Sequence, residues 1–371
     1  MFLETLLAKV ANCVQPNTFL AVLPTNSPPI FPQASMKIIV PMAGMGKRMR
    51  PHTLTVPKPL IPIAGKPIVQ RLVEDIARVC GEPVEEVAFI IGRFGSAVEK
   101  SLVAIAESVG AKGTIYYQDE PLGTAHAILC AKPSLSGPLV VAFADTLFKA
   151  DFKLDSSVPG TIWVQKVDDP RPFGVVKLDD KGQITDFVEK PETFVSDLAI
   201  IGIYYFQDGE YLRDELQYLL DNDIKDKGEY QLTNALENMK SKGTIFVPGQ
   251  VTEWLDCGNK DATVYTNQRY LEYLKERGEK LVSDSAKITN SVLIEPVYIA
   301  DGVSISNSVV GPHVSISSGA KIDDSRVVNS IVQSAAAVRH ANVENSMIGN
   351  SAVLTGQPAD LSLGDFNVLR V

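Results

Sequence analysis

The sequence predicts an α/β domain followed by a parallel β-helix. From Met36 to about residue 277, short apolar runs typical of buried strands alternate with helical patterns. After Gly278, branched residues recur every five or six positions between Gly, Ser, Asn, Asp and Ala. That period fits neither a helix nor an alternating strand, and it is typical of a hexapeptide β-helix, in which each turn stacks its branched residue on the next.

The elements of the α/β region follow in order along the chain. The first strand begins at Met36, and Pro67 opens a helix in which apolar residues recur at helical spacing. The other predicted elements are strands at 87–91, 115–117 and 139–144 and helices near 210–220, 230–240 and 261–277. The strand at 139–144 is continuously apolar and leads to Asp145, at the carboxyl end of a strand, where ligands bind in open α/β sheets.

The predicted β-helix covers residues 279–371, with turns of roughly eighteen residues. The residues expected to stack are Ile288, Ile294, Ile299, Ile305, Val310, Ile316, Ile322 and Val328, and then Val343, Ile348 and Val353. The remaining residues, to Val371, are expected to cap its open end.

Residues 1–35 are expected to be a poorly ordered extension outside the core. Their apolar run is interrupted by polar residues such as Lys9 and Asn12, and it is too short to span a bilayer. Glu4 precedes Lys9, which is unlike the basic start of a signal peptide. The chain is therefore divided into residues 1–35, an α/β domain at 36–278 and a β-helix domain at 279–371.

The composition limits the classes of partner. A formal net charge of -9 argues against nucleic acid or an anionic membrane as a partner. The four cysteines are scattered and form no C-x-x-C motif, so neither a disulfide framework nor a zinc site is indicated. We expect a reducing, cytoplasmic setting.

Positive charge is concentrated in residues 36–73, which contain seven Lys or Arg residues and no Asp or Glu. Within this segment a glycine-rich turn, Gly44-Met45-Gly46, leads to Arg48. Glycines allow the main chain to approach phosphate oxygens, and its N–H groups can form a concave anion site. The spacing is not that of a Walker A loop, and Met49 stands where a Rossmann fingerprint has its third glycine. We interpret the segment as a nucleoside triphosphate site.

A family resemblance appears at these residues. The pattern of Gly44, Gly46, Arg48 and Pro51, followed by the run 57–60 (Pro-Lys-Pro-Leu), resembles the signature of sugar-1-phosphate nucleotidyltransferases. Glucose-1-phosphate thymidylyltransferases and related uridylyltransferases are the most similar members, and the resemblance continues to about residue 354. It implies a Rossmann-like nucleotidyltransferase sheet followed by a left-handed β-helix, an exception to the right-handed crossover rule.

The resemblance also implies a reaction. A sugar-1-phosphate oxygen attacks the α-phosphorus of a nucleoside triphosphate, and glucose 1-phosphate with dTTP or UTP is the expected pair. Catalysis would rest on positioning and charge neutralisation. Arg48, Lys58 and Lys190 are the expected catalytic cations. Asp145 and Asp256 are the expected Mg²⁺ ligands. Asp145 stands in the run 143–146 (Phe-Ala-Asp-Thr), where many relatives have Gly-Asp-Asn, so the resemblance does not extend to the local ribose contacts.

Further binding residues follow from the same resemblance. The nucleotide-binding residues are expected to be Ala43, Gly44, Gly46, Gln118, Gly123 and Thr124. The sugar-binding residues are expected to be Gly174, Glu189 and Gly202. The Gln118 amide offers a donor and an acceptor to a pyrimidine edge. His126 is expected to be packed within its helix rather than catalytic.

Three alternatives remain open. The first is a bifunctional uridylyltransferase and acetyltransferase that makes UDP-N-acetylglucosamine, with His313 or His340 as a general base on the β-helix. The second is a mannose-1-phosphate guanylyltransferase. The third is a catalytically silent regulatory subunit, which loss of Arg48, Asp145 or Lys190 would have favoured. We favour an assembly role for the β-helix and expect a homo-oligomer, with no nucleic-acid or membrane partner.

Overall fold

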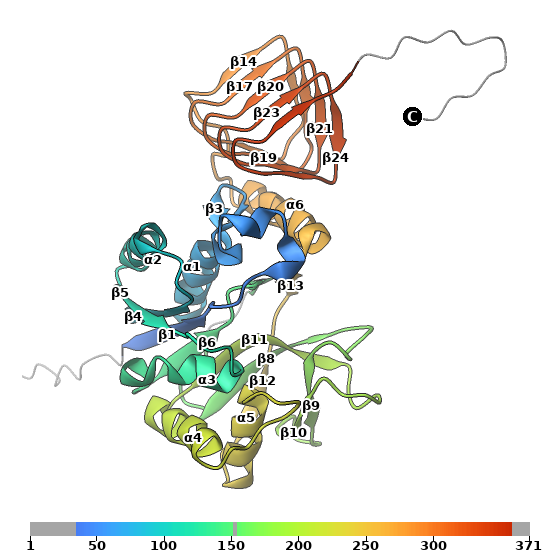
Figure 1. Cartoon of the computed structure of the whole chain (residues 1–371). Helices are drawn as coiled ribbons and strands as arrows, with labels where there is room; N and C mark the ends of the chain where they lie inside the picture. The colour runs from blue at the N-terminus through green and yellow to red at the C-terminus, as the bar shows by residue number, and fades with distance from the viewer. Residues whose placement is uncertain (1–34, 151–153, 358–371) are drawn as a thin grey trace, which may run out of the picture. The chain divides into compact units, whose positions relative to one another are not determined.

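The computed structural model of the chain describes residues 35–150 and 154–357. The expected N-terminal extension, apart from residue 35, and the expected cap after residue 357 therefore lie outside the described residues. Figure 1 shows the described elements, with a mixed β-sheet and its helices first and the β-helix last along the chain.

Nine strands of the described chain form one mixed sheet, in which β10, β9, β11, β6, β1, β4 and β5 lie in that order and β8 pairs with both β11 and β12. The pairs of β1 with β4, β1 with β6 and β4 with β5 are parallel, whereas β11 runs antiparallel to β6. The strands are β1 (Met36–Pro41), β4 (Val84–Ile91), β5 (Lys112–Tyr117), β6 (Leu139–Ala142), β8 (Gly160–Lys166), β9 (Gly174–Leu178), β10 (Ile184–Glu189), β11 (Leu198–Phe206) and β12 (Phe246–Gln250).

Helices cover both faces of this sheet. They are α1 (Ile68–Cys80), α2 (Ser96–Ser108), α3 (Thr124–Leu129), α4 (Gly209–Asp221), α5 (Leu232–Ser241) and α6 (Lys260–Glu276). Alternate residues of β1 point to opposite faces, so that Ile38 belongs to the hydrophobic cluster with α1, α2 and α6, and Ile39 belongs to the cluster with α3, α4 and α5. The predicted helix after Pro67 is confirmed, and so are the strands and helices placed by periodicity, within a few residues at their ends.

Short elements connect this sheet to the predicted site. Three 3₁₀ turns, η1 (Lys47–Met49), η2 (His52–Leu54) and η3 (Lys58–Leu60), follow β1, and a small hairpin joins β2 (Pro62–Ile63) to β3 (Lys66–Pro67). A further turn, η4 (Lys132–Ser134), precedes β6. The two-stranded antiparallel sheet of β7 (Thr146–Lys149) and β13 (Glu253–Asp256) begins directly after Asp145 and ends at Asp256.

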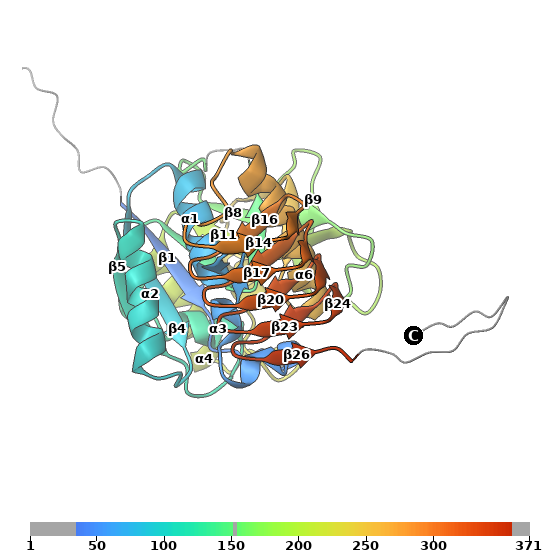
Figure 2. The same ribbon diagram turned by 90° about the horizontal axis from the view of Figure 1, so that it is seen from above.

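The C-terminal region is a parallel β-helix with three parallel sheets, as the sequence predicted. Figure 2 shows the strands of one sheet lying side by side in successive coils. The sheets are β14 (Lys287–Thr289), β17 (Ser304–Ser306), β20 (Lys321–Asp323), β23 (Ala337–Arg339) and β26 (Val353–Thr355); β15 (Val292–Leu293), β18 (Val309–Val310), β21 (Arg326–Val328) and β24 (Asn342–Glu344); and β16 (Val297–Ile299), β19 (Val314–Ile316), β22 (Ile331–Val332) and β25 (Met347–Ile348). This arrangement is that of the left-handed β-helix expected from the resemblance.

The coils are shorter than the eighteen residues expected. Lys287 pairs with Ser304, Ser304 with Lys321, Lys321 with Ala337 and Ala337 with Val353, so successive coils contain 17, 17, 16 and 16 residues. The two later coils each lack one corner residue that the earlier coils contain. The stack continues through the alanine-rich stretch after Ser334, where small side chains hide the branched pattern but Val338 is fully buried.

Three of the predicted stacking residues are displaced by one position. Leu293 pairs with the fully buried Val310, whereas the predicted Ile294 is 43% exposed. Val327 is fully buried and faces the interior, whereas the predicted Val328 is partly exposed. In the last described coil Leu354 pairs with the buried Val338, and the predicted Val353 is 68% exposed. Side chains alternate across a strand, so a displacement of one residue moves the side chain to the other face. Where two apolar residues are adjacent, the sequence pattern does not indicate which of them faces the interior.

The β-helix packs against the α/β region through α6 and the β2–β3 turn. Asn267 of α6 is fully buried, and its Oδ1 accepts hydrogen bonds from the backbone N–H of Ala64 at 2.9 Å and from the hydroxyl of Ser315 at 2.7 Å. Ile331 and Met347 belong to the same hydrophobic cluster as residues of α1 and α6. The proposed boundary at 278/279 lies between α6 and β14 and stays a prediction, because this packing makes the two regions one contact unit.

Candidate active site

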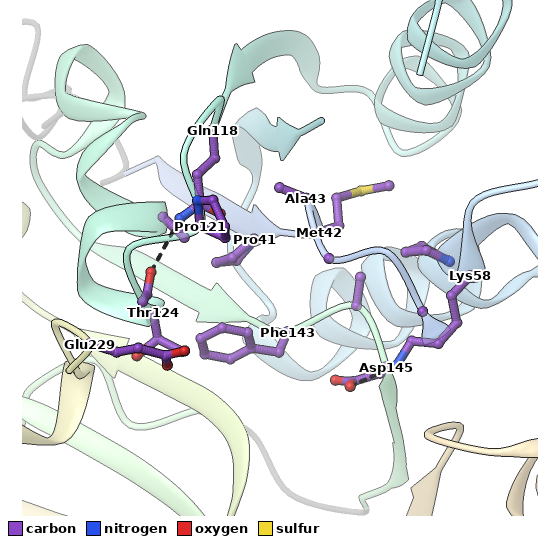
Figure 3. Close-up of a pocket in the computed structure, with 16 residues that line it drawn as sticks. Pro41, Met42, Ala43, Lys58, Gln118, Pro121, Thr124, Phe143, Asp145 and Glu229 are labelled. Carbon is purple, nitrogen blue, oxygen red and sulfur yellow. Dashed lines mark hydrogen bonds and ion pairs between the residues drawn. The ribbon is translucent and has the colours of Figure 1, made fainter. Parts of the chain in front are cut away.

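A cavity of about 280 Å³ opens where β1, β5 and β6 end, at the edge of the sheet that the sequence predicted (Figure 3). Its walls contain all six predicted nucleotide-binding residues together with Lys58 and Asp145. The residues that line it are Pro41, Met42, Ala43, Gly44, Gly46, Lys58, Pro59, Gln118, Pro121, Gly123, Thr124, Ala127, Phe143, Ala144, Asp145 and Glu229.

The two glycines of the turn have different structural roles. A side chain at Gly44 would meet no atom within 4 Å, so this position is open toward the cavity. Gly46 has φ 56°, and a Cβ there would lie 3.0 Å from the Cβ of Lys58. Gly46 is thus required for the left-handed turn and for its close packing against Lys58. Gly44 leaves space that a ligand can fill.

Lys58 and Asp145 form an ion pair on the cavity wall. The Nζ atom of Lys58 donates to Oδ2 of Asp145 at 2.8 Å, and the two side chains are 12% and 40% exposed. Lys58 lies in η3 between Pro57 and Pro59, which restrict the backbone on both sides of it. The sequence predicted both residues, and the structure brings them together.

The second predicted metal ligand, Asp256, is held near Asp145 by backbone pairing. Asp256 pairs with Thr146 across β7 and β13, and the next N–H, that of Cys257, donates to the carbonyl of Asp145 at 2.9 Å. Burial raises the pKa of the Asp256 carboxyl, and the negative charge of Asp145 raises it further.

Two cations and a backbone N–H oppose that shift in the Asp256 pKa. The Gly258 N–H donates to Oδ1 of Asp256 at 2.9 Å, and the charges of Lys58 and Arg48 also stabilise the carboxylate. A Cβ at Gly258 would lie 3.0 Å from the Asp256 oxygens and 3.2 Å from Nη2 of Arg48. Arg48 is therefore beside Asp256, although neither of them lines the cavity itself.

The other end of the cavity contains Gln118 and Gly123. Nε2 of Gln118 donates to the carbonyl oxygen of Gly123 at 3.2 Å and lies 3.1 Å from Nδ1 of His126. Gly123 has φ 118°, and a Cβ there would lie 2.4 Å from the carbonyl oxygen of Tyr230. Gly123 is therefore required by the packing of the α3 start against Tyr230, a reason that the sequence did not reveal.

Residues 229–233 join the nucleotide end of the site to the predicted sugar end, and the sequence reasoning assigned them no functional role. Glu229 lines the cavity. The hydroxyl of Thr124 donates to Oε1 of Gln231 at 3.1 Å and accepts from the N–H of Leu232 at 2.9 Å. Thr124 thus holds this segment in place. The sequence did show a polar stretch here, directly before a predicted helix. It gave no sign that this stretch contacts Thr124, which lies more than a hundred residues away in the chain.

The predicted sugar-binding residues form a second group, outside the cavity lining. Gly174 and Glu189 are paired across β9 and β10, and a Cβ at Gly174 would lie 3.1 Å from Oε2 of Glu189. The same Oε2 accepts from the hydroxyl of Thr233 at 3.3 Å. Lys190 is exposed, and its Nζ lies 3.4 Å from Oε1 of Glu189. The structure therefore brings Gly174, Glu189 and Lys190 together.

Gly202, the third predicted sugar-binding residue, lies beside Phe143 and Thr146 and not with Gly174 and Glu189. It has φ 86° and lies where the pairing of β11 with β8 is irregular. Its carbonyl oxygen accepts from the N–H of Phe143 at 3.0 Å, and Phe143 lines the cavity. Gly202 thus shapes the strand edge beside Asp145.

Comparison with known proteins assigns the family. A family model described as nucleotidyl transferase matches residues 37–273. The chain belongs to this family. The low-salt glycan biosynthesis nucleotidyltransferase Agl11 of Haloferax volcanii is 31% identical over 69% of this chain and 72% of its own length. The glucose-1-phosphate thymidylyltransferase of Streptomyces antibioticus is 29% identical over 86% of this chain and 94% of its own length.

Other relatives have different names. They include the mannose-1-phosphate guanylyltransferase catalytic subunit beta of Danio rerio, which is 28% identical over 71% of this chain and 72% of its own length. The bifunctional protein GlmU of Methanococcus vannielii is 29% identical, and the match covers 70% of this chain and 61% of that protein. The chain thus spans about three fifths of the GlmU protein's length.

The solved structure of a UDP-glucose pyrophosphorylase complexed with UDP-glucose superposes with a TM-score of 0.53 at 25% identity, over 64% of this chain and 99% of that one. The predicted family, fold class and enzyme class are confirmed by these relatives: the chain is a member of a family of sugar-1-phosphate nucleotidyltransferases. Within the described residues, none of the helices combines the length and the hydropathy needed to span a membrane.

Proposed function

We propose that this chain transfers a nucleoside monophosphate from a nucleoside triphosphate to a sugar 1-phosphate and releases pyrophosphate. A phosphate oxygen of the sugar 1-phosphate attacks the α-phosphorus, and the bond from this phosphorus to the oxygen that bridges to the β-phosphate breaks. The leaving pyrophosphate carries away that electron pair, so negative charge grows on it. The main support is the cavity in which the glycine turn, Lys58 and Asp145 meet.

The cations have distinct roles in this proposal. Lys58 is held by flanking prolines and by Asp145, so its ammonium group is preorganised beside the reacting phosphates. Arg48 is exposed at the end of the glycine turn, where its planar guanidinium can bind the β- and γ-phosphates with two hydrogen bonds. Lys190 neutralises the incoming sugar phosphate, while the carboxylate of Glu189 accepts from sugar hydroxyls.

Asp145 and Asp256 fit a magnesium ion. Backbone pairing holds the two acidic residues close together, and the raised pKa of Asp256 reflects their mutual repulsion in addition to burial. In the described part of the chain no group of three or more His, Cys, Asp or Glu side chains could hold a metal. Two carboxylates suit Mg²⁺, because this ion keeps several waters and accepts substrate phosphates as ligands. When bound, it would neutralise charge on the triphosphate.

The expected substrates are glucose 1-phosphate and dTTP or UTP. The thymidylyltransferase relative supports this choice, because its match extends over 86% of this chain and 94% of its own length and so includes part of the β-helix region. The guanylyltransferase relative keeps mannose 1-phosphate with GTP as an alternative.

A substrate panel tests the proposal. Purified protein with MgCl₂ would be given dTTP, UTP, GTP, CTP or ATP together with glucose 1-phosphate, mannose 1-phosphate or N-acetylglucosamine 1-phosphate, and pyrophosphate release would be measured. We expect release with dTTP or UTP and glucose 1-phosphate, and none when the sugar phosphate is omitted. Release with GTP and mannose 1-phosphate alone would establish the alternative. No release with any pair would support a catalytically silent subunit.

The acetyltransferase alternative depends on His313 or His340. His313 is only 19% exposed, and its Nε2 lies 3.0 Å from Oε1 of Glu272 on α6. His340 is 54% exposed, and its Nδ1 lies 3.4 Å from Oδ2 of Asp324. Acetyl-CoA turnover on glucosamine 1-phosphate that is lost in His313→Ala or His340→Ala would establish this activity. Its absence from the wild type would leave the β-helix with an assembly role.

Assembly and location complete the proposal. We infer a homo-oligomer that forms through the β-helix, because its first and last described coils expose apolar side chains such as Val292 and Val353. Light scattering of the wild type and of Val353→Lys would test this. We also propose a cytoplasmic location, without a nucleic-acid or membrane partner, which suits the acidic charge and a nucleotide substrate.

A further inference from the structure

The side-chain amide of Gln118 has only one orientation that satisfies its surroundings. The carbonyl oxygen of Gly123 lies 3.2 Å from Nε2 of Gln118, and a carbonyl can only accept a hydrogen bond. If the amide were rotated by 180°, two oxygens would face each other. The NH₂ group of Gln118 therefore points to Gly123, and this assignment does not depend on the protonation of any neighbour.

His126 accepts a hydrogen bond from the second hydrogen of the same NH₂ group. Its Nδ1 lies 3.1 Å from Nε2 of Gln118. Since Nε2 is a donor, Nδ1 of His126 must be the unprotonated acceptor, and the neutral ring carries its proton on the other nitrogen. The expectation that His126 is simply packed within its helix therefore omitted its contact with the predicted base-binding residue.

These two contacts leave only the Oε1 atom of Gln118 for a ligand. Among the described residues no group donates a hydrogen bond to this oxygen, and Gln118 lines the cavity. An amide that is free to rotate can present either N–H or oxygen to a base, and so it can match either a donor or an acceptor. A locked amide presents the oxygen alone.

We propose that His126 is a positioning residue that locks Gln118 and thereby sets the choice of base, an inference that rests on the proposed function. With dTTP or UTP, the imino N3–H of the base donates to Oε1 of Gln118. Cytosine in the same position has a lone pair at N3, which would face the lone pairs of Oε1. Together with the Gly123 carbonyl, His126 thus holds the Gln118 amide as an acceptor that discriminates between uracil or thymine and cytosine.

Two variants of His126 separate this role from helix packing. In asparagine, Oδ1 occupies the place of the histidine Nδ1, so His126→Asn keeps an acceptor for the Gln118 amide. In His126→Leu a methyl group takes that place and no acceptor remains. Wild type and both variants would be assayed with UTP, dTTP and CTP at saturating sugar 1-phosphate, and their melting temperatures would be measured.

For His126→Leu we expect the KM for UTP or dTTP to rise by roughly tenfold, which is about the worth of one hydrogen bond, with a smaller change in kcat. The ratio of kcat/KM for UTP to that for CTP should also fall, because the amide then keeps only its hydrogen bond to the Gly123 carbonyl and is held less firmly. His126→Asn should retain most of the wild-type affinity and selectivity. If His126→Leu does not fold, His126→Ala replaces it, since alanine is favourable in a helix.

The outcomes distinguish this inference from the proposed function. If the wild type uses dTTP or UTP, but the variant without an acceptor keeps the wild-type KM and the wild-type discrimination against CTP, the positioning role is wrong and the function stands. Equal losses in His126→Asn and His126→Leu would show that packing alone matters and would also overturn it. A wild type that releases no pyrophosphate with any triphosphate contradicts the proposed function itself.

Discussion

At the scale of single residues, the site depends on opposite charges that lie within hydrogen-bond distance of one another. Lys58 is the most buried of the three predicted catalytic cations, and its ammonium group contacts Asp145 directly. Without Lys58, the carboxylates of Asp145 and Asp256 would repel each other and the triphosphate. Without Asp145, the ammonium group of Lys58 would lose the carboxylate that it contacts. Each charge therefore reduces the electrostatic repulsion that the other charges would have in the same small volume.

The first prediction concerns Asp145. Asp145→Asn keeps the shape of the side chain but removes the charge that would bind Mg²⁺ and hold Lys58. We expect kcat to fall by at least about a hundredfold, or roughly 2.7 kcal/mol of transition-state stabilisation, as for removal of one preorganised electrostatic contact. The melting temperature should change little, because the side chain is 40% exposed. Pyrophosphate release and thermal unfolding would be measured together.

Asp284→Asn is the matched control for this substitution. Asp284 also pairs with a lysine, Lys280, but its side chain is 90% exposed and it lies outside the cavity lining. The control should keep wild-type turnover. Undiminished activity in Asp145→Asn would remove Asp145 from the metal site.

The second prediction uses two glycines of the same cavity. An alanine methyl at Gly44 meets no protein atom, so we expect Gly44→Ala to melt like the wild type but to raise the KM for the triphosphate by roughly tenfold, since the methyl occupies ligand space. Gly123→Ala places its methyl 2.4 Å from the Tyr230 carbonyl at positive φ. It should destabilise the fold by roughly 1–3 kcal/mol. Melting curves and triphosphate titrations of both variants would show whether the two effects separate in this way.

Short motifs allowed the candidate site residues to be proposed from the sequence, but they did not indicate which residues surround them. Lys58 and Asp145 are each marked by a local pattern, and the structure places them 2.8 Å apart. The contact of Thr124 with Gln231 depends on how α3 meets α5, and that packing leaves no local trace in the sequence. The lock on Gln118 was missed for another reason: it depends on the path of the turn at Gly123, which brings position 126 back to position 118.

At the scale of elements, α6 connects the catalytic region to the β-helix. Asn267 on this helix is fully buried and accepts hydrogen bonds from the β2–β3 turn and from β19. The same β2–β3 turn follows η3, which carries Lys58. A polar side chain at such a junction fixes which atoms meet, because a shifted arrangement would leave buried groups without partners.

The third prediction tests this junction. Asn267→Leu would leave the N–H of Ala64 and the hydroxyl of Ser315 buried without their acceptor, so we expect the free energy of unfolding to fall by roughly 2–4 kcal/mol. Ser315→Ala is the matched variant, because it removes a donor and leaves Asn267 bonded to Ala64. It should cost only about 1 kcal/mol. Urea unfolding of both variants would provide the values, and equal costs would show that the hydrogen bonds are not what matters at this junction.

The sequence predicted elements well where periodicity was strong and poorly where it was not. The helix after Pro67 and the strand that leads to Asp145 carry clear apolar patterns. The antiparallel strands β8 and β11 were not anticipated, because their pairing joins segments whose order in a sheet is set by tertiary packing. In the β-helix the period identified the fold, but it could not choose between Val327 and Val328 as the inward residue.

At the scale of the whole molecule, the β-helix contributes to the same core as the catalytic region. Ile331 and Met347 pack in the hydrophobic cluster that contains Leu271 of α6. Lys260, at the start of α6, also donates to the carbonyl oxygen of Asn345 at 3.0 Å. The boundary proposed at 278/279 stays a prediction, and the contacts across it predict that the α/β region and the β-helix unfold together.

The fourth prediction follows from this shared core. A protein that ends at Gly278 would expose the apolar surface of α6 and leave Asn267 without Ser315, so we expect its melting temperature to fall by at least about 5 °C relative to residues 36–371 and its solubility to decrease. Triphosphate binding should weaken with it, because the turn between β2 and β3 loses its support directly after the segment that carries Lys58. Calorimetry of both proteins would show one transition for the longer chain. Two separate transitions in the longer chain, together with an unchanged melting temperature in the shorter one, would mean that the β-helix is an independent domain whose contacts with α6 add nothing to the stability of the catalytic region.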